Sequence, residues 1–92
     1  MSMKHNGLAK LCEETGELAQ VVGKLLQYPE LQNFTEELHP DGTNLRLRLA
    51  DEMADVMAAI VYVGATLNLD RQLFSERVDF KAALFFKWRD ET

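Results

Sequence analysis

The chain has 92 residues, with ten Lys or Arg against fifteen Asp or Glu and a net charge of −5. This length predicts one domain, residues 1–92, with a thin core. An acidic chain without a Lys- or Arg-rich run is not expected to bind nucleic acid through its phosphates. Its longest uncharged run, 56–69, is shorter than the ~20 residues that cross a bilayer, so we expect a cytoplasmic protein with no membrane partner.

Helical periodicity predicts the first elements, and no alternating strand pattern is present in the sequence. Apolar residues recur every three or four positions after Asn6, a candidate N-cap, which predicts a helix over 7–27 that Pro29 ends. The single cysteine, Cys12, lies among leucines and is expected to be a small buried apolar residue. A short helix is expected over 30–38.

A turn and two long helices complete the predicted fold. The segment 39–44 has the composition of a turn and offers Asn44 as the cap of a helix over 45–67. The half of this helix over 56–67 is apolar or small on every side, which is typical of a helix buried all round. A last helix with several aromatic residues is expected over 71–90. The sequence therefore predicts an all-α fold.

Acidic pairs interrupt the two most apolar helices. Glu14 and Glu17, with Glu13 beside them, lie in the first of these helices, and Glu52 and Asp55 lie in the second. Side chains three residues apart share a helix face, so packing these two helices together would bring four carboxylates into one small space. Such a cluster must be solvated, partly protonated or neutralised by a bound metal.

Ordinary helix ion pairs are the alternative explanation of these acids. Lys10 is three and four residues before two of them, and Arg48 is four residues before a third. Glu17 and Asp55 have no basic residue at those spacings, which favours a metal site. Since the cluster offers only carboxylates, Mg²⁺ or Mn²⁺ is the expected ion.

The segments LCEETGEL at 11–18 and DEMADV at 51–56 resemble the E-E-x-x-E … E-x-x-D signature of the MazG-like all-α nucleotide pyrophosphohydrolases. The resemblance extends over about residues 8 to 88. It implies an enzyme that requires two or more Mg²⁺ ions, for which Mn²⁺ can substitute. The reaction it implies is cleavage of a nucleoside triphosphate between the α and β phosphates, which gives the monophosphate and pyrophosphate.

The resemblance also implies the roles of the acids. Glu14, Glu17, Glu52 and Asp55 match the family's metal ligands. Glu13 matches an additional acid that helps to bind metal or accepts a proton from water.

Four further residues are candidates for substrate binding. Arg77 and Lys81 lie one turn apart on the aromatic side of the last helix, where they would meet the phosphates. The alternative is that their stems simply lie along the aromatic face. Tyr62 and Trp88 are candidates to stack on the base, although an aromatic residue at helical spacing is often part of a core.

Compact single-domain members of this family are common in phage genomes, which would place this chain in a host cytoplasm. A purine triphosphate such as dGTP is the expected substrate. Phosphoribosyl-ATP pyrophosphatases share the scaffold and remain an alternative, although this chain has Ala58-Ala59-Ile60 where their Tyr-His pattern is expected. A non-catalytic, metal-stabilised helical interaction module is the third possibility.

The thin core has a consequence for assembly. One copy offers too little apolar cover for 56–67 on all sides. We therefore expect a helical-hairpin protomer that forms a four-helix-bundle core by homodimerisation, and two such dimers would make a homotetramer.

Overall fold

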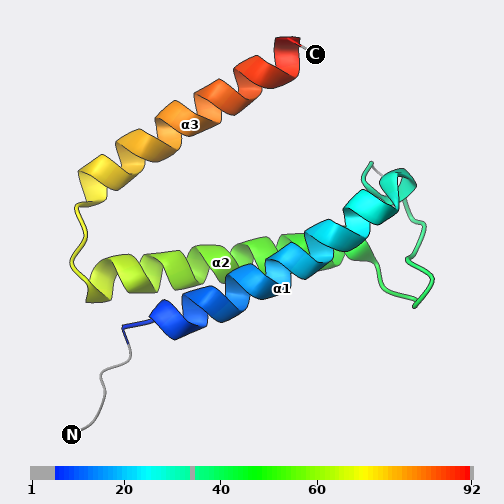
Figure 1. The fold of residues 1–92 in the computed structure, drawn as a ribbon, viewed down its shortest axis with the longest axis horizontal. Helices are drawn as coiled ribbons and strands as arrows, with labels where there is room; N and C mark the ends of the chain where they lie inside the picture. Colours follow the sequence, from blue (N-terminus) through cyan, green and yellow to red (C-terminus); the bar gives the residue numbers. More distant parts are fainter. Residues whose placement is uncertain (1–5, 34, 92) are drawn as a thin grey trace, which may run out of the picture.

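The computed structural model describes residues 6–33 and 35–91, and within these ranges the chain is helical with no strand. Its elements, in chain order, are α1 (Leu8–Gln27), the single 3₁₀ turn η1 (Pro29–Leu31), α2 (Leu45–Thr66) and α3 (Arg71–Glu91). The predicted all-α class is confirmed. Helices α1 and α2 lie side by side as an antiparallel hairpin, whereas α3 leaves the end of α2 and stands apart (Figure 1). None of these helices combines the length and apolarity that a bilayer span requires.

Helix α1 begins one residue later than predicted. The N-cap position is Gly7, at a φ of +87°, and the carboxamide oxygen of Asn6 accepts a hydrogen bond from the backbone N–H of Leu8 at 3.0 Å. Asn6 therefore satisfies one free N–H of the first turn from the position before the cap. The helix ends before Pro29, as predicted.

The prediction of a short helix over 30–38 is wrong. Only η1 (Pro29–Leu31) is helical, and the described residues after it are irregular up to the turn. The Gln32 amide donates to a backbone carbonyl near the end of α1 at 2.8 Å, and the Thr35 hydroxyl accepts from the backbone N–H of Glu37 at 3.1 Å. Local side-chain bonds of this kind compete with the helical hydrogen-bond pattern.

The caps of the last two helices are built from short polar side chains. The turn expected over 39–44 is present, with Gly42 at a φ of +88°. The Asn44 oxygen accepts from two backbone N–H groups in the first turn of α2, both at 3.1 Å. The Asp70 carboxylate accepts from a backbone N–H in the first turn of α3 at 3.0 Å. These bonds explain why α2 and α3 begin where the sequence predicts.

The core is small and lies inside the hairpin. Its buried apolar side chains come from α1, η1 and α2, and they are Val21, Leu25, Leu31, Leu45, Ala59 and Val63. No described residue of α3 is buried. The hairpin is therefore the packed part of the single chain.

Two burial predictions are wrong for the single chain. The second half of α2 is not buried all round, since Met57 and Val61 expose 62% and 68% of their surface. Cys12 is exposed as well. The cause is the same in both cases: the hairpin packs only one face of each helix, and the described chain provides nothing to cover the outer faces.

Candidate metal centre

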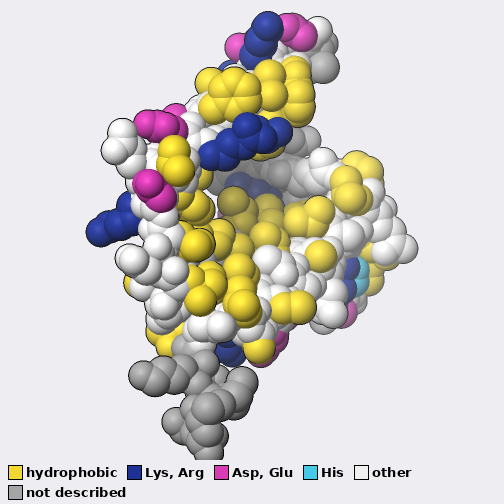
Figure 2. Space-filling view, turned by 60° about the vertical axis from the view of Figure 1, so that its left-hand side comes forward, with side chains coloured by type: hydrophobic (Ala, Val, Ile, Leu, Met, Phe, Trp, Pro, Cys, Tyr) yellow, Lys and Arg dark blue, Asp and Glu magenta, His cyan; other side chains and the backbone are white. Residues whose placement is uncertain are grey.

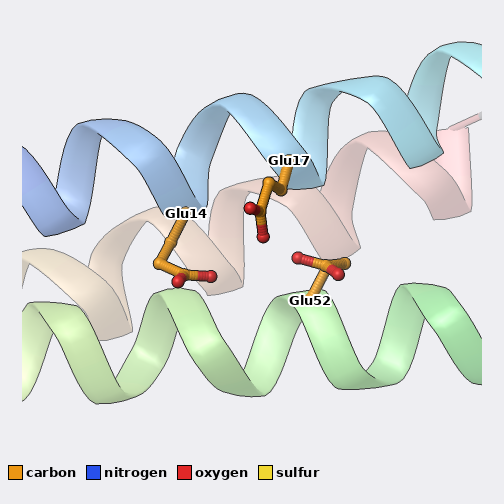
Figure 3. Close-up of side chains that lie close together, drawn as sticks. All are labelled: Glu14, Glu17 and Glu52. Carbon is orange, nitrogen blue, oxygen red and sulfur yellow. The ribbon is translucent and has the colours of Figure 1, made fainter.

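The hairpin brings three of the predicted acids together. Glu14 and Glu17 are one turn apart on α1, and Glu52 lies across from them on α2, so their side chains extend into the space between the two helices (Figure 3). One carboxylate oxygen from each residue lies within 4.8 Å of the others. This group, the carboxylate cluster, contains three of the four predicted ligands.

Two members of the cluster are largely removed from solvent. Glu52 is 4% exposed, and its Oε1 lies 2.9 Å from the Nε of Arg48 in an ion pair. Glu14 is partly buried, and its Oε1 lies 3.8 Å from the Nζ of Lys10. The Oε2 atoms of Glu14 and Glu52 are both buried without a hydrogen-bond partner among the described residues. Each buried orphan of this kind costs about 1–3 kcal/mol, so the cluster lacks a partner for these two oxygens.

Glu17, the third member, is affected by the negative charges of the other two. The negative charge of Glu14 raises the pKa of Glu17 above its ordinary value, and desolvation and the neighbouring Glu52 raise it further. The proton is therefore held more tightly on Glu17 than on a free glutamate. A bound cation would offset the repulsion that raises the pKa of Glu17.

The donor set fits a hard divalent cation. It consists of carboxylate oxygens from Glu14, Glu17 and Glu52, and two of these residues have an oxygen with no other partner. Oxygen ligands suit Mg²⁺, Mn²⁺ or Ca²⁺. The three carboxylates alone do not select magnesium among these ions. Among residues 6–33 and 35–91, no second group of three acids, His or Cys meets in this way.

Two predicted site acids lie outside the cluster. Asp55 is exposed on α2, and Glu13 is exposed on α1, where its carboxylate lies 3.3 Å from the Nζ of Lys10. The three ion pairs that the spacing of Lys10 and Arg48 suggests are thus all present. Within the described ranges no ion pair involves Asp55.

The predicted phosphate-binding residues are on α3, away from the cluster. The Lys81 Nζ lies 5.2 Å from the ring centroid of Phe85 and 6.0 Å from that of Trp88. The Arg77 guanidinium lies 5.5 Å from the ring centroid of Phe80. Both cations therefore lie along the aromatic face of α3. Because this helix stands apart from the hairpin (Figure 1), a single chain does not bring them to the carboxylates.

The two predicted base-stacking residues also differ in their surroundings. Trp88 is half-exposed beside Phe85, with ring centroids 5.4 Å apart. Tyr62, on α2, packs against the start of α1: a Cβ placed on Gly7 would lie only 2.6 Å from the Tyr62 ring. The Tyr62 ring thus packs against the N-terminal end of α1.

Comparisons with known proteins give no family for this chain. No protein-family model matches it, and no curated protein and no solved structure shows significant similarity to it.

Proposed function

We propose that the chain is a Mg²⁺-dependent nucleoside triphosphate pyrophosphohydrolase of the MazG-like type. The single observation that supports this most is the carboxylate cluster, in which Glu14 and Glu52 each present a buried oxygen without a partner. A cation between the helices would satisfy both oxygens and relieve the repulsion within the cluster. The E-E-x-x-E and E-x-x-D spacing supplies the link to nucleotide hydrolysis.

In this proposal the acids have two roles, metal binding and proton acceptance. Glu14, Glu17 and Glu52 hold the cation, and Asp55, one turn from Glu52 on α2, becomes the fourth ligand when its exposed side chain turns toward the cluster. Bound Mg²⁺ would supply Lewis acidity toward the phosphates and acidify a water molecule. Glu13, exposed beside the cluster, accepts the proton of the attacking water.

The bond that breaks is the one between the α-phosphorus and the oxygen that bridges to the β-phosphate. Water adds to the α-phosphorus, and pyrophosphate leaves, so the products are the nucleoside monophosphate and pyrophosphate. Arg77 and Lys81 stabilise the negative charge on the leaving group, and Tyr62 and Trp88 contact the base. We propose a purine substrate such as dGTP.

The working form in this proposal is a homodimer with a four-helix-bundle core, or a dimer of such dimers. The exposed apolar side chains on the outer face of α2 support self-association, since helices of a second copy would cover them. The cluster itself is complete within one hairpin.

The test is pyrophosphate release from a panel of ribo- and deoxynucleoside triphosphates, with and without Mg²⁺, with the nucleotide product identified by chromatography. We expect metal-dependent turnover of one purine triphosphate. Glu52→Gln should lower this turnover about 10²-fold or more, because changing the groups that only support metal ligands already costs about 10- to 100-fold. Glu37→Gln, an exposed acid in the loop before α2, is the matched control and should retain activity.

Each other outcome of this assay has a meaning. Turnover of phosphoribosyl-ATP alone would replace the proposed substrate with that compound. No turnover of any of these nucleotides by a folded, Mg²⁺-binding protein would refute the enzymatic proposal and leave the interaction module.

A further inference from the structure

Helix α3 has apolar side chains along its whole length, and none of its described residues is buried. Seven large apolar residues of α3 are each about half or more exposed: Leu73, Phe74, Val78, Phe80, Phe85, Phe86 and Trp88. A soluble helix of this kind normally buries such side chains against another element. The described chain does not provide that element.

A matching apolar surface lies between α3 and the hairpin. It is a hollow of about 750 Å³. Its lining includes Leu11 of α1, Ile60 and Val61 of α2, and Phe74 of α3. Figure 2 shows apolar side chains covering the floor of this hollow, with Lys and Arg side chains on its rim. The hollow can therefore accept apolar side chains from the face of another helix.

The exposed area of the chain is large enough for a stable dimer. The chain exposes 7528 Å², whereas a folded monomer of 10.5 kDa exposes about 5,400 Å². The seven residues outside the described ranges would contribute about 1,250 Å² as extended chain, and subtracting this area still leaves an excess of about 850 Å². A standard stable interface buries about 800 Å² on each partner, so the excess suffices.

The direction of α3 is fixed by the elbow that joins it to α2. Asn68 adopts a φ of +54°, and the backbone N–H groups of Leu67 and Leu69 donate to carbonyls of the last turns of α2 at 2.9 and 3.0 Å. The Asp70 cap then starts α3. These bonds extend the ordered end of α2 to Leu69 and begin α3 directly after it, which leaves only a short connection between the two helices.

Charge also favours contact between α3 and the rest of another chain. Residues 1–70 contain five Lys or Arg and eleven Asp or Glu, a net charge of −6, whereas residues 71–92 contain five and four, a net charge of +1. Pairing two hairpins places like charges together. Pairing α3 with a hairpin places opposite net charges together.

We infer that two copies of this chain exchange α3, so that α3 of each copy packs its apolar side chains into the hollow of the other. This inference rests on the self-association in the proposed function but not on the metal or the nucleotide. The exchange is reciprocal, as in a two-fold symmetric dimer. It covers the hollow and α3 at the same time.

The first test is the mass of the full chain in solution, by light scattering after size exclusion over a wide range of concentration. We expect twice 10.5 kDa. Val61→Glu on α2 and Phe85→Glu on α3 change residues that are 68% and 51% exposed in the single chain, so both variants should fold but run as monomers. Leu38→Glu, at a 53% exposed loop position, is the matched control and should stay dimeric.

The second test distinguishes exchange of α3 from pairing of like helices. In an equimolar mixture of the two monomeric variants, the Phe85→Glu chain has an intact hollow and the Val61→Glu chain has an intact α3. Exchange therefore predicts that a mixed dimer appears, while each variant alone stays monomeric.

Three results would overturn the inference: a monomeric wild type, dimers that persist in both variants, or no dimer in the mixture. Circular dichroism on each variant shows whether it is folded. If Val61→Glu is unfolded, Ile60→Glu at another residue of the hollow lining takes its place. A monomeric wild type that turns over nucleotide would refute the exchange and leave the proposed chemistry, whereas an associated protein without turnover would refute only the proposed chemistry.

Discussion

Repulsion within the carboxylate cluster should lower the stability of the metal-free protein, and Glu14→Gln tests this effect. An oxygen of Glu14 lies within 4.8 Å of one of Glu52. Their charges therefore repel by at least about 3.5 kcal/mol at an effective dielectric of about 20. The substitution also removes the contact with Lys10 at 3.8 Å, but Lys10 is largely exposed, so that ion pair is worth only about 0–1 kcal/mol. The metal-free variant should be more stable than the wild type by about 2 kcal/mol or more.

The assay is thermal unfolding followed by circular dichroism in EDTA, at neutral pH and a fixed protein concentration. A gain of about 2 kcal/mol raises the melting temperature of a domain this size by at least about 8 °C. The control is Glu13→Gln on the same helix, whose carboxylate is exposed, and its melting temperature should change little. Addition of Mg²⁺ at about 100 times its dissociation constant should stabilise the wild type by about 2.7 kcal/mol but should hardly affect Glu14→Gln.

The sign of the result decides between the two explanations of these acids. If Glu14 serves chiefly as the partner of Lys10, neutralising it lowers the melting temperature in EDTA. A lower or unchanged melting temperature of Glu14→Gln in EDTA would therefore refute the reasoning that repulsion within the cluster destabilises the metal-free protein. Mg²⁺ stabilisation of wild type and variant by equal amounts would remove Glu14 from the ligand set.

Three further predictions concern the local structure. Asn44→Ala removes the cap of α2 and should cost about 1 kcal/mol, or about 4–8 °C in melting temperature by circular dichroism. Gly7→Ala should lower the melting temperature, because Gly7 has a φ of +87° and the added Cβ would lie 2.6 Å from Tyr62. Gly16→Ala, in open space within α1, should raise the melting temperature. A higher melting temperature for Gly7→Ala than for Gly16→Ala would contradict the geometry at Gly7. Hydrogen bonds in the turn, chiefly with Thr43, lower the pKa of Asp41 below its usual 3.8. The ionised Asp41 therefore contributes to folding stability above that pH, and this contribution is lost as the pH falls below it. Denaturant titrations of the wild type and Asp41→Asn should give free energies of unfolding that converge in acid.

The sequence predicts the helices well because their limits are set by nearby residues. Asn44 and Asp70 accept backbone N–H groups two or three residues further along the chain, so spacing alone reveals them. The segment 30–38 misleads because Gln32 bonds to a carbonyl seven residues earlier, which helical periodicity does not encode. The exposure of Val61 is also beyond periodicity, because burial depends on what covers a helix and not on its own sequence.

The candidate site is predictable to the same extent. The three-residue spacing places Glu14 and Glu17 on one face, and their proximity to Glu52 follows once the two helices pack. The position of Asp55 outside the cluster depends on the register and crossing of α1 and α2, which no local pattern reveals. The location of Lys81 depends on the elbow before α3, where Asn68 at positive φ turns the chain away from the hairpin.

In the proposed function, the metal ligands and the phosphate-binding residues belong to different elements of the chain. All three members of the cluster belong to the hairpin, and Glu52 is 4% exposed in the structure, in which α3 stands apart from the hairpin. Arg77 and Lys81 belong to α3, so in one chain they lie on a different element from the carboxylates. If a second copy supplies α3, a dissociated Val61→Glu chain should still gain stability from Mg²⁺ but should lose turnover. Loss of both together would mean that the hairpin does not hold the carboxylates in place by itself.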